Sequence, residues 1–193
     1  MKILAYIETT VRDRHGKIIS HKKKPSRSFV RGFNHILCAQ IRQETTPDPA
    51  ILTKATNGVL YNIRNSSGCL RANGPVGNDD YGIMVGTSNQ AVDIEDYALI
   101  AAIAEGVAAG QMNHQLCSAT YLGVAAGVSS FTVDRSILNN SGDTINIEEA
   151  GIYVMATKAP TALIYVMVMR DLVSQAVPDG GGITVTYTIR IAA

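Results

Sequence analysis

Residues 130–154 read SFTVDRSILNNSGDTINIEEAGIYV, and this stretch decides the fold class. Apolar and polar side chains alternate on both sides of a run of turn-forming residues, Asn139–Asp143. A period of two places successive side chains on opposite faces of an extended chain, while Asn, Ser, Gly and Asp favour tight turns. The stretch therefore predicts two antiparallel strands joined as a β-hairpin.

The predicted hairpin has an apolar face and a turn whose residues have distinct roles. The apolar side chains of its first strand are Phe131, Val133 and Ile137. In the turn we expect Gly142 to adopt a positive φ, and Asn140 or Asp143 to bond to its own backbone. A single hairpin cannot cover its own apolar face, so the rest of the chain must supply a second layer.

Other segments extend the β pattern. Further strands are predicted at 2–13, 58–64, 81–87, 115–128, 163–169 and 183–191. The last of these alternates most clearly, and 163–169 is apolar throughout, as expected of a strand buried on both faces. We therefore expect a mainly β (α+β) chain that forms an antiparallel β-sandwich, with the jelly roll as one possible form. Residues 1–193 are expected to be one domain, on which an N-terminal hairpin and helix (1–45) pack.

One amphipathic helix is predicted at 28–43, where apolar side chains recur at helical spacing. Gly32 lowers helix propensity and so indicates a close contact, and His35 is expected to be a structural histidine. Residues 94–105 allow two interpretations. Their alanine content and Asp93 as a cap favour a helix, whereas the glycines that follow favour an extended, loop-rich chain.

The composition limits the function classes. The chain has 193 residues, with 17 Lys+Arg against 16 Asp+Glu, and this balance argues against a general nucleic-acid binder. Charged residues make up 17% and apolar residues 46%, which fits a subunit that buries surface in an assembly or a monomer with a large core. The apolar runs are too short for a membrane span, and the N-terminus does not resemble a secretory signal.

The sequence shows no recognisable chemistry. The three cysteines form no CxxC pair and are expected to be buried, reduced thiols. No nucleophile elbow, HExxH or phosphate-binding loop occurs, and the four histidines have no metal-ligand spacing. The turn carboxylates Asp79, Asp80, Asp93, Glu95 and Asp96 lack a calcium-loop pattern. We expect no cofactor, no metal and no enzymatic activity.

A cationic segment, HKKKPSR at 21–27, is the clearest candidate for an interaction. Pro25 indicates a break, so we expect a basic loop that is either solvated or docked on an acidic neighbouring subunit. A role in binding nucleic acid is the weaker hypothesis. The candidate interaction residues are Lys22, Lys23, Lys24, Arg27 and Arg31.

Three segments resemble virion structural proteins of tailed bacteriophages. They read GTSNQAVDIEDYALIAAIAEGVAAGQMNH from Gly86, SFTVDRSILNNSGDTINIEEAGIYV from Ser130, and MRDLVSQAVPDGGGITVTYTIRI from Met169. The resemblance covers roughly the last 110 residues. It consists of packing and turn motifs without catalytic residues, and it favours an extended chain at 94–105.

The resemblance implies a non-enzymatic structural subunit located in the virion, and a head decoration or cement protein fits the moderate size best. Such a subunit would bind the major capsid protein or other virion subunits, and copies of itself as a trimer or higher homo-oligomer, without membrane or nucleic acid. One alternative is a tail, collar or fibre-associated protein. Another is a host-facing carbohydrate-binding sandwich, whose candidate aromatic platforms are Tyr61, Tyr81, Tyr97 and Tyr121.

Overall fold

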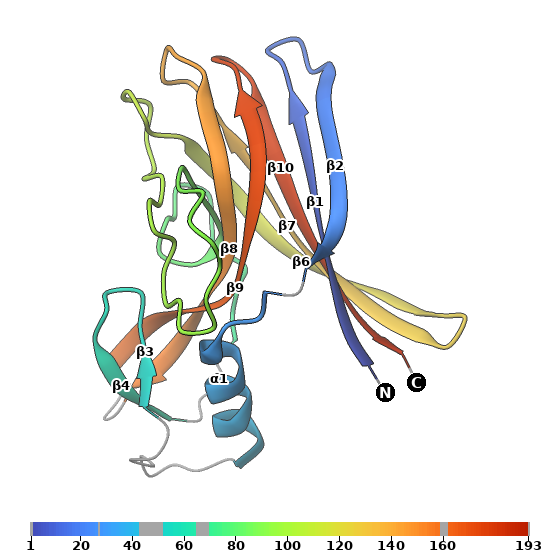
Figure 1. Ribbon diagram of the computed structural model, residues 1–193, viewed down its shortest axis with the longest axis vertical. Coiled ribbons are helices and arrows are strands. Elements are labelled where there is room, and N and C mark those ends of the chain that lie inside the picture. Colours follow the sequence, from blue (N-terminus) through green and yellow to red (C-terminus); the bar gives the residue numbers. More distant parts are fainter. Residues whose placement is uncertain (1, 27, 43–51, 65–69, 159–161, 193) are drawn as a thin grey trace.

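The computed structural model describes residues 2–26, 28–42, 52–64, 70–158 and 162–192. The chain is mainly β, with two antiparallel five-stranded sheets and, in these ranges, one α-helix (Figure 1). The predicted fold class, a β-sandwich-like α+β fold, is confirmed.

The two sheets are named A and B. Sheet A has the order β2 (Ile18–Ser26), β1 (Lys2–Arg12), β10 (Gly182–Ala192), β7 (Val128–Leu138) and β6 (Asn113–Ala125). Sheet B is built on β8 (Ile145–Lys158), which pairs with β9 (Ala162–Val177), β5 (Gly82–Gly86) and β4 (Leu60–Arg64), while β3 (Leu52–Lys54) pairs with β4. One side of β8 is paired with β9 along nearly its whole length. The other side of β8 is therefore shared by β5 and β4.

The predicted hairpin at 130–154 is wrong in its pairing. Its two halves, β7 and β8, are strands as expected, but they lie in different sheets. β7 pairs with β10 in sheet A, and β8 pairs with β9 in sheet B. The strands β7, β8, β9 and β10 thus form a long two-stranded ribbon that is folded at its middle. Alternation specifies an extended chain, whereas the choice of partner strand depends on residues far away in the sequence.

Asn139 holds the fold of this ribbon together. Its backbone N–H donates to Gly181 O at 2.9 Å, and its carbonyl accepts from Gly180 N at 2.8 Å. Its buried side-chain Nδ2 donates to Asp143 O at 2.7 Å and to Val177 O at 2.8 Å. One side chain therefore joins the β7–β8 crossover to the β9–β10 crossover.

The predicted turn residues have smaller roles than Asn139. Gly142 has φ of +92°, the positive value expected of it, and its N–H donates to Asp179 Oδ1 at 2.8 Å. Asn140 does not bond to its own backbone and instead donates to Asn113 Oδ1 at 2.9 Å. Asp143 contributes its backbone carbonyl rather than its carboxylate. The turn is thus specified by its one buried amide.

The core lies between the sheets and follows the predicted alternation of β10. Ile183, Val185 and Tyr187 are almost completely buried, and Tyr187 donates its hydroxyl proton to Ala150 O of β8 at 3.0 Å. This hydrogen bond crosses from sheet A to sheet B. It gives the polar end of this buried side chain a hydrogen-bond acceptor.

The helix α1 (Arg31–Arg42) is shorter than the predicted 28–43. It packs beside β9, β3 and β4 (Figure 1). Gly32 marks a close approach, because a Cβ there would lie 2.4 Å from Met167 O. Residues 94–105 contain no helix and form turns and isolated bridges, as the resemblance implies.

The cysteine prediction is only half right. Cys117 is buried, but Cys38 on α1 is exposed, and Cys69 lies outside the described residues. Burial raises the pKa of the Cys117 thiol, which keeps it protonated and unreactive.

We predict that Asn139→Ala lowers the free energy of unfolding by about 2–4 kcal/mol, because buried carbonyls of both crossovers lose their donor. The neighbouring Asn140→Ala is the matched control and should cost less than about 0.5 kcal/mol, since its hydrogen bond is exposed. Urea denaturation measures both values. Equal losses in the two variants would show that Asn139 does not hold the crossovers.

Candidate functional site

The predicted basic loop is a strand. Residues 22–24 lie within β2, and the alternation of β2 divides the three lysines between two environments. Lys22 and Lys24 reach across to sheet B, where they donate to the carbonyls of Ser174 and Leu172. Lys23 faces the other way and pairs with Glu8 of β1 at 3.0 Å.

This arrangement closes one side of the sandwich. Next to the two lysines, Ser26 Oγ donates to Asp171 Oδ2 at 2.7 Å, and Gln175 Nε2 donates to Thr9 Oγ1 at 2.7 Å. The register of β9 shifts in this region, which leaves its carbonyls available to the side chains of sheet A. The Lys22 and Lys24 ammonium groups thus bond to carbonyls of the same chain. They do not lie in a loop that an acidic partner could bind.

The four predicted interaction residues that the structure describes do not form one site. Arg31 begins α1 and pairs with Glu95 at 2.9 Å, separate from the lysines of β2. Arg27 lies outside the described residues.

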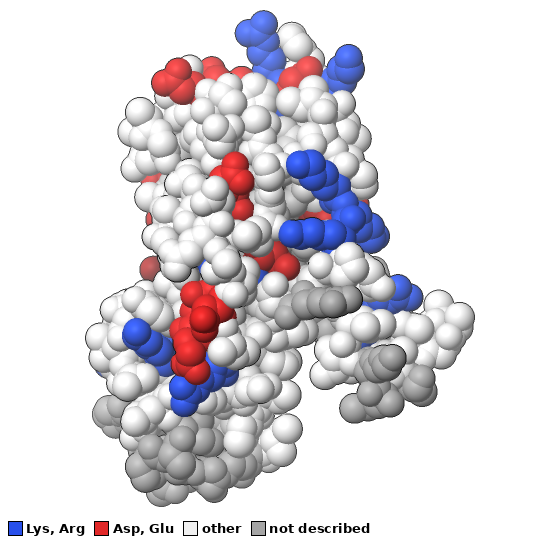
Figure 2. Space-filling model, in the orientation of Figure 1, with Lys and Arg blue, Asp and Glu red and all other residues white. Residues whose placement is uncertain are grey.

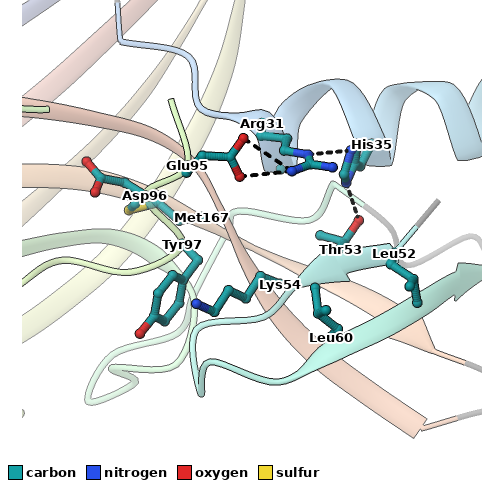
Figure 3. A pocket seen from close by; sticks show the side chains of 11 residues that line it. Arg31, His35, Leu52, Thr53, Lys54, Leu60, Glu95, Asp96, Tyr97 and Met167 are labelled. Carbon is teal, nitrogen blue, oxygen red and sulfur yellow. Dashed lines mark hydrogen bonds and ion pairs between the residues drawn. The ribbon is translucent and has the colours of Figure 1, made fainter. Parts of the chain in front are cut away.

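A pocket of about 240 Å³ lies beside Arg31, between α1, the β3–β4 pair and residues 95–97 (Figure 3). Its charged groups are already engaged with each other or with neighbours. Arg31 meets Glu95, and Lys54 Nζ lies 3.9 Å from the centroid of the Tyr97 ring. Asp96 accepts from Arg170 at 2.7 Å. The pocket therefore ties three segments together and leaves little unpaired charge for a ligand.

His35 lines this pocket with a defined hydrogen-bonding role. Its Nε2 accepts from Arg31 Nε at 3.1 Å, so the ring proton of neutral His35 lies on Nδ1, 2.9 Å from Thr53 Oγ1. Burial, and after it the charge of Arg31, lowers the pKa of His35. This geometry agrees with the predicted structural histidine and offers no free base for catalysis.

A buried ionic network positions the long segment 87–105 over sheet B. Arg170 of β9 and Glu149 of β8 are fully buried and 2.8 Å apart. Glu149 accepts from the N–H groups of Ile100 and Ala101, and Arg170 donates to Asp96 and to backbone carbonyls at 90–91. Arg170 thus forms its ion pair across the sheet, from the middle of β9.

A second buried arginine, Arg135 of β7, organises residues 73–80 by a different means. Its guanidinium donates to carbonyl oxygens of Pro75, Asn78, Ile83 and Gln115, at 2.6–3.1 Å. It lies on the face that the sequence analysis assigned to Val133 and Ile137. A charged residue in the middle of an apolar face is the sequence signal of this buried arginine, and the sequence-based prediction did not use it.

Next to Arg135, the buried His114 is held by Glu105. Glu105 Oε2 accepts from the His114 backbone N–H at 2.6 Å and lies 3.0 Å from its Nδ1. The other ring nitrogen, Nε2, is buried without a hydrogen-bond partner among the described residues. Burial, followed by the charge of Arg135, lowers the pKa of His114.

The other residues considered in the sequence analysis, the potential metal ligands and the tyrosines of a glycan-binding platform, do not gather into a site. Within the described ranges, His, Cys, Asp and Glu form no cluster that could hold a metal. Tyr81 is buried, Tyr61 and Tyr97 each lie under a lysine ammonium, and Tyr121 is remote from them on β6. In the same part of the chain, no helix has the length and hydropathy to cross a bilayer.

The largest unexplained feature is apolar. The inner face of sheet A, which sheet B covers elsewhere, continues uncovered at one end of four strands. On β1, exposure rises from 2% at Ile7 to 48% at Ile3; on β10, it rises from 0% at Tyr187 to 43% at Ile191. Phe131 and Tyr121 are similarly exposed at the same end of β7 and β6.

We call this surface the apolar shelf and define it by Ile3, Ile191, Phe131, Tyr121 and Val124. The strand register places these residues in two adjacent rows on one face. The shelf belongs to the arm that carries the β6–β7 hairpin and both chain ends away from the body of the molecule (Figure 1). Figure 2 shows that this arm is mostly uncharged, whereas charged groups mark the rest of the visible face.

One sequence signal could have found the shelf. From Gly106 to Val133 the chain contains no Asp, Glu, Lys or Arg, although exposed strands normally carry charge. The alternation of these strands is visible in the sequence, but the extent to which sheet B covers their apolar face depends on the tertiary structure.

Comparison with protein-family models, with curated proteins and with solved structures finds no match to this chain.

We predict that His114 makes the protein less stable in mild acid. Because its folded pKa is lowered, the unfolded chain binds the proton first, so stability is full above the ordinary pKa of 6.5 and declines as the pH falls below it. The loss should approach about 1.4 kcal/mol per pH unit until the folded histidine is protonated as well.

The test compares urea denaturation of the wild type and His114→Gln between pH 7.5 and 5.5. The variant lacks the titrating ring and should lose less stability over this range, whatever its stability at pH 7.5. Parallel curves would show that His114 does not contribute to the pH dependence.

Proposed function

We propose that this chain is a non-enzymatic structural subunit of a tailed-bacteriophage virion, most specifically a head decoration or cement protein. It would bind the capsid lattice and copies of itself. The observation that carries the proposal is the apolar shelf, an uncharged and uncovered extension of the core-facing side of sheet A.

The shelf supports binding to a protein surface for a physical reason. Contiguous exposed apolar area is costly in water, and a soluble chain retains a large patch mainly where a partner covers it. The supporting framework is rigid, because the four strands of the shelf continue into the buried core. A flat apolar platform on a rigid sheet suits a lattice better than it suits a small substrate.

The resemblance to phage virion proteins supplies the identity of the partner. Its motifs include the crossover at Asn139 and strand β10, which together build the sheet that carries the shelf. A tail, collar or fibre position would use the same surface against a different partner. The tyrosines offer less support for a glycan-binding role, because Tyr81 is buried and two others are covered by lysines.

The test is co-sedimentation of the purified chain with empty heads and, separately, with tails of the phage that encodes it. We expect binding to heads, and at least tenfold weaker binding for Ile3→Asp combined with Ile191→Asp, because burying two carboxylates on the shelf is unfavourable.

Leu163→Asp is the matched control, since Leu163 is an equally exposed apolar residue on β9 that does not belong to the shelf. This variant should bind heads like the wild type. Binding to tails alone would move the subunit to the tail, and binding to neither particle would contradict the structural role.

A further inference from the structure

Sheet A has two edge strands, and only one of them is protected against pairing with another chain. The edge strand β2 carries His21, three lysines and Pro25, and it is further held by its lysine contacts to β9. Lysines and proline on an edge oppose the addition of a further strand.

The other edge strand, β6, has none of these devices. It contains no charged residue and no proline over its 13 residues, Asn113–Ala125. Its first part is covered, because Gly77 N donates to His114 O at 2.8 Å and Cys117 N donates to Gly74 O at 2.9 Å. Beyond Cys117, no backbone hydrogen bond from the described residues reaches its outer side.

The hydrogen bond of Cys117 also shows which groups are free. Its N–H points away from β7, and backbone groups alternate in direction along a strand, so Ala119 and Tyr121 point the same way. The register with β7 is regular from Cys117 to Tyr121 and shifts only after Tyr121. The open edge therefore presents two adjacent outward residues, each with a free N–H and C=O.

We propose that β6 pairs antiparallel with β6 of a second copy, about a twofold axis at Thr120. In this register the N–H of Ala119 donates to the C=O of Tyr121 in the second copy, and the C=O of Ala119 accepts from the N–H of the same residue. The reverse pairing follows by symmetry. This contact would be the surface through which the proposed virion subunit binds copies of itself. The biological role of the contact rests on that proposed function.

A second copy fits this edge better than an unrelated strand does. The occupant must be extended, uncharged and as long as the free edge, and β6 itself meets all three conditions. Four large apolar side chains flank the edge and are more than half exposed: Leu116, Tyr121, Leu122 and Val124. Their exposed area is on the order of 500 Å² per copy, so burying all of it would give ~1,000 Å² in total, the lower bound for a specific interface.

The first experiment measures the mass of the purified full chain by light scattering over a dilution series. We expect a dimer, or an even-numbered assembly if the shelf adds a second contact. Ala119→Pro should weaken dimerisation at least tenfold, because proline removes an outward N–H and leaves the bonds of Ser118 and Thr120 to β7 intact. The matched control, Ala119→Thr, keeps this N–H and should remain dimeric.

The second experiment does not depend on whether the protein folds with a proline at position 119. With Cys38 and Cys69 changed to serine, Thr120→Cys should form a covalent dimer on mild oxidation, because residue 120 faces its own copy across a non-hydrogen-bonded pair. Ile19→Cys, at an exposed position on the protected β2 edge, is the control and should remain uncrosslinked.

A monomeric or trimeric wild type, an unweakened Ala119→Pro dimer, or Thr120→Cys crosslinking no better than Ile19→Cys would each overturn the β6 contact. These outcomes are distinguishable from failure of the proposed function. A monomer that still sediments with heads would exclude the edge pairing alone, whereas a dimer that binds no particle would exclude the virion role alone.

Discussion

The side-chain amide of Asn139 is the interaction on which the rest of the structure depends. It lies where the two-stranded ribbon of β7, β8, β9 and β10 folds from one sheet to the other, and it bonds to both crossovers. This link fixes the place where the chain passes from sheet A, with β7 and β10, to sheet B, with β8 and β9. The fold at Asn139 brings the two halves face to face and so creates the core. A buried amide is suited to this position, because it satisfies several backbone groups that no strand can reach.

The two buried arginines perform a related task for the long loops. Arg170 binds two carboxylates and backbone carbonyls, and so holds segment 87–105 against sheet B. Arg135 binds mainly backbone carbonyls and holds residues 73–80. An uncompensated buried charge is very unfavourable, so each arginine fixes the loop that supplies its partners. The arm that bears the apolar shelf has no comparable covering segment among the described residues, which distinguishes it from the rest of sheet A.

Much of the local structure could be predicted, and most of the site could not. The positions of β1, β5 and β10, and the close contact at Gly32, follow from alternation and from the missing side chain. Pro25 predicts a break and so a loop for the basic segment, yet proline is tolerated on an edge strand such as β2. Asp96, one partner of Arg170, and Leu172, the partner of Lys24, lie more than 70 residues away in the sequence, and short-range patterns contain no information about such distances.

The sequence by itself determined that the chain is built of amphipathic strands, because a period of two requires nothing beyond neighbouring residues. It also determined that residues 106–133 carry no charge. Only the tertiary structure decided that the strands on either side of Asn139 belong to different sheets, because pairing is settled by competition among all strands for hydrogen bonds and apolar cover. It also decided that one end of sheet A extends beyond sheet B, and so turned part of a core face into an exposed surface.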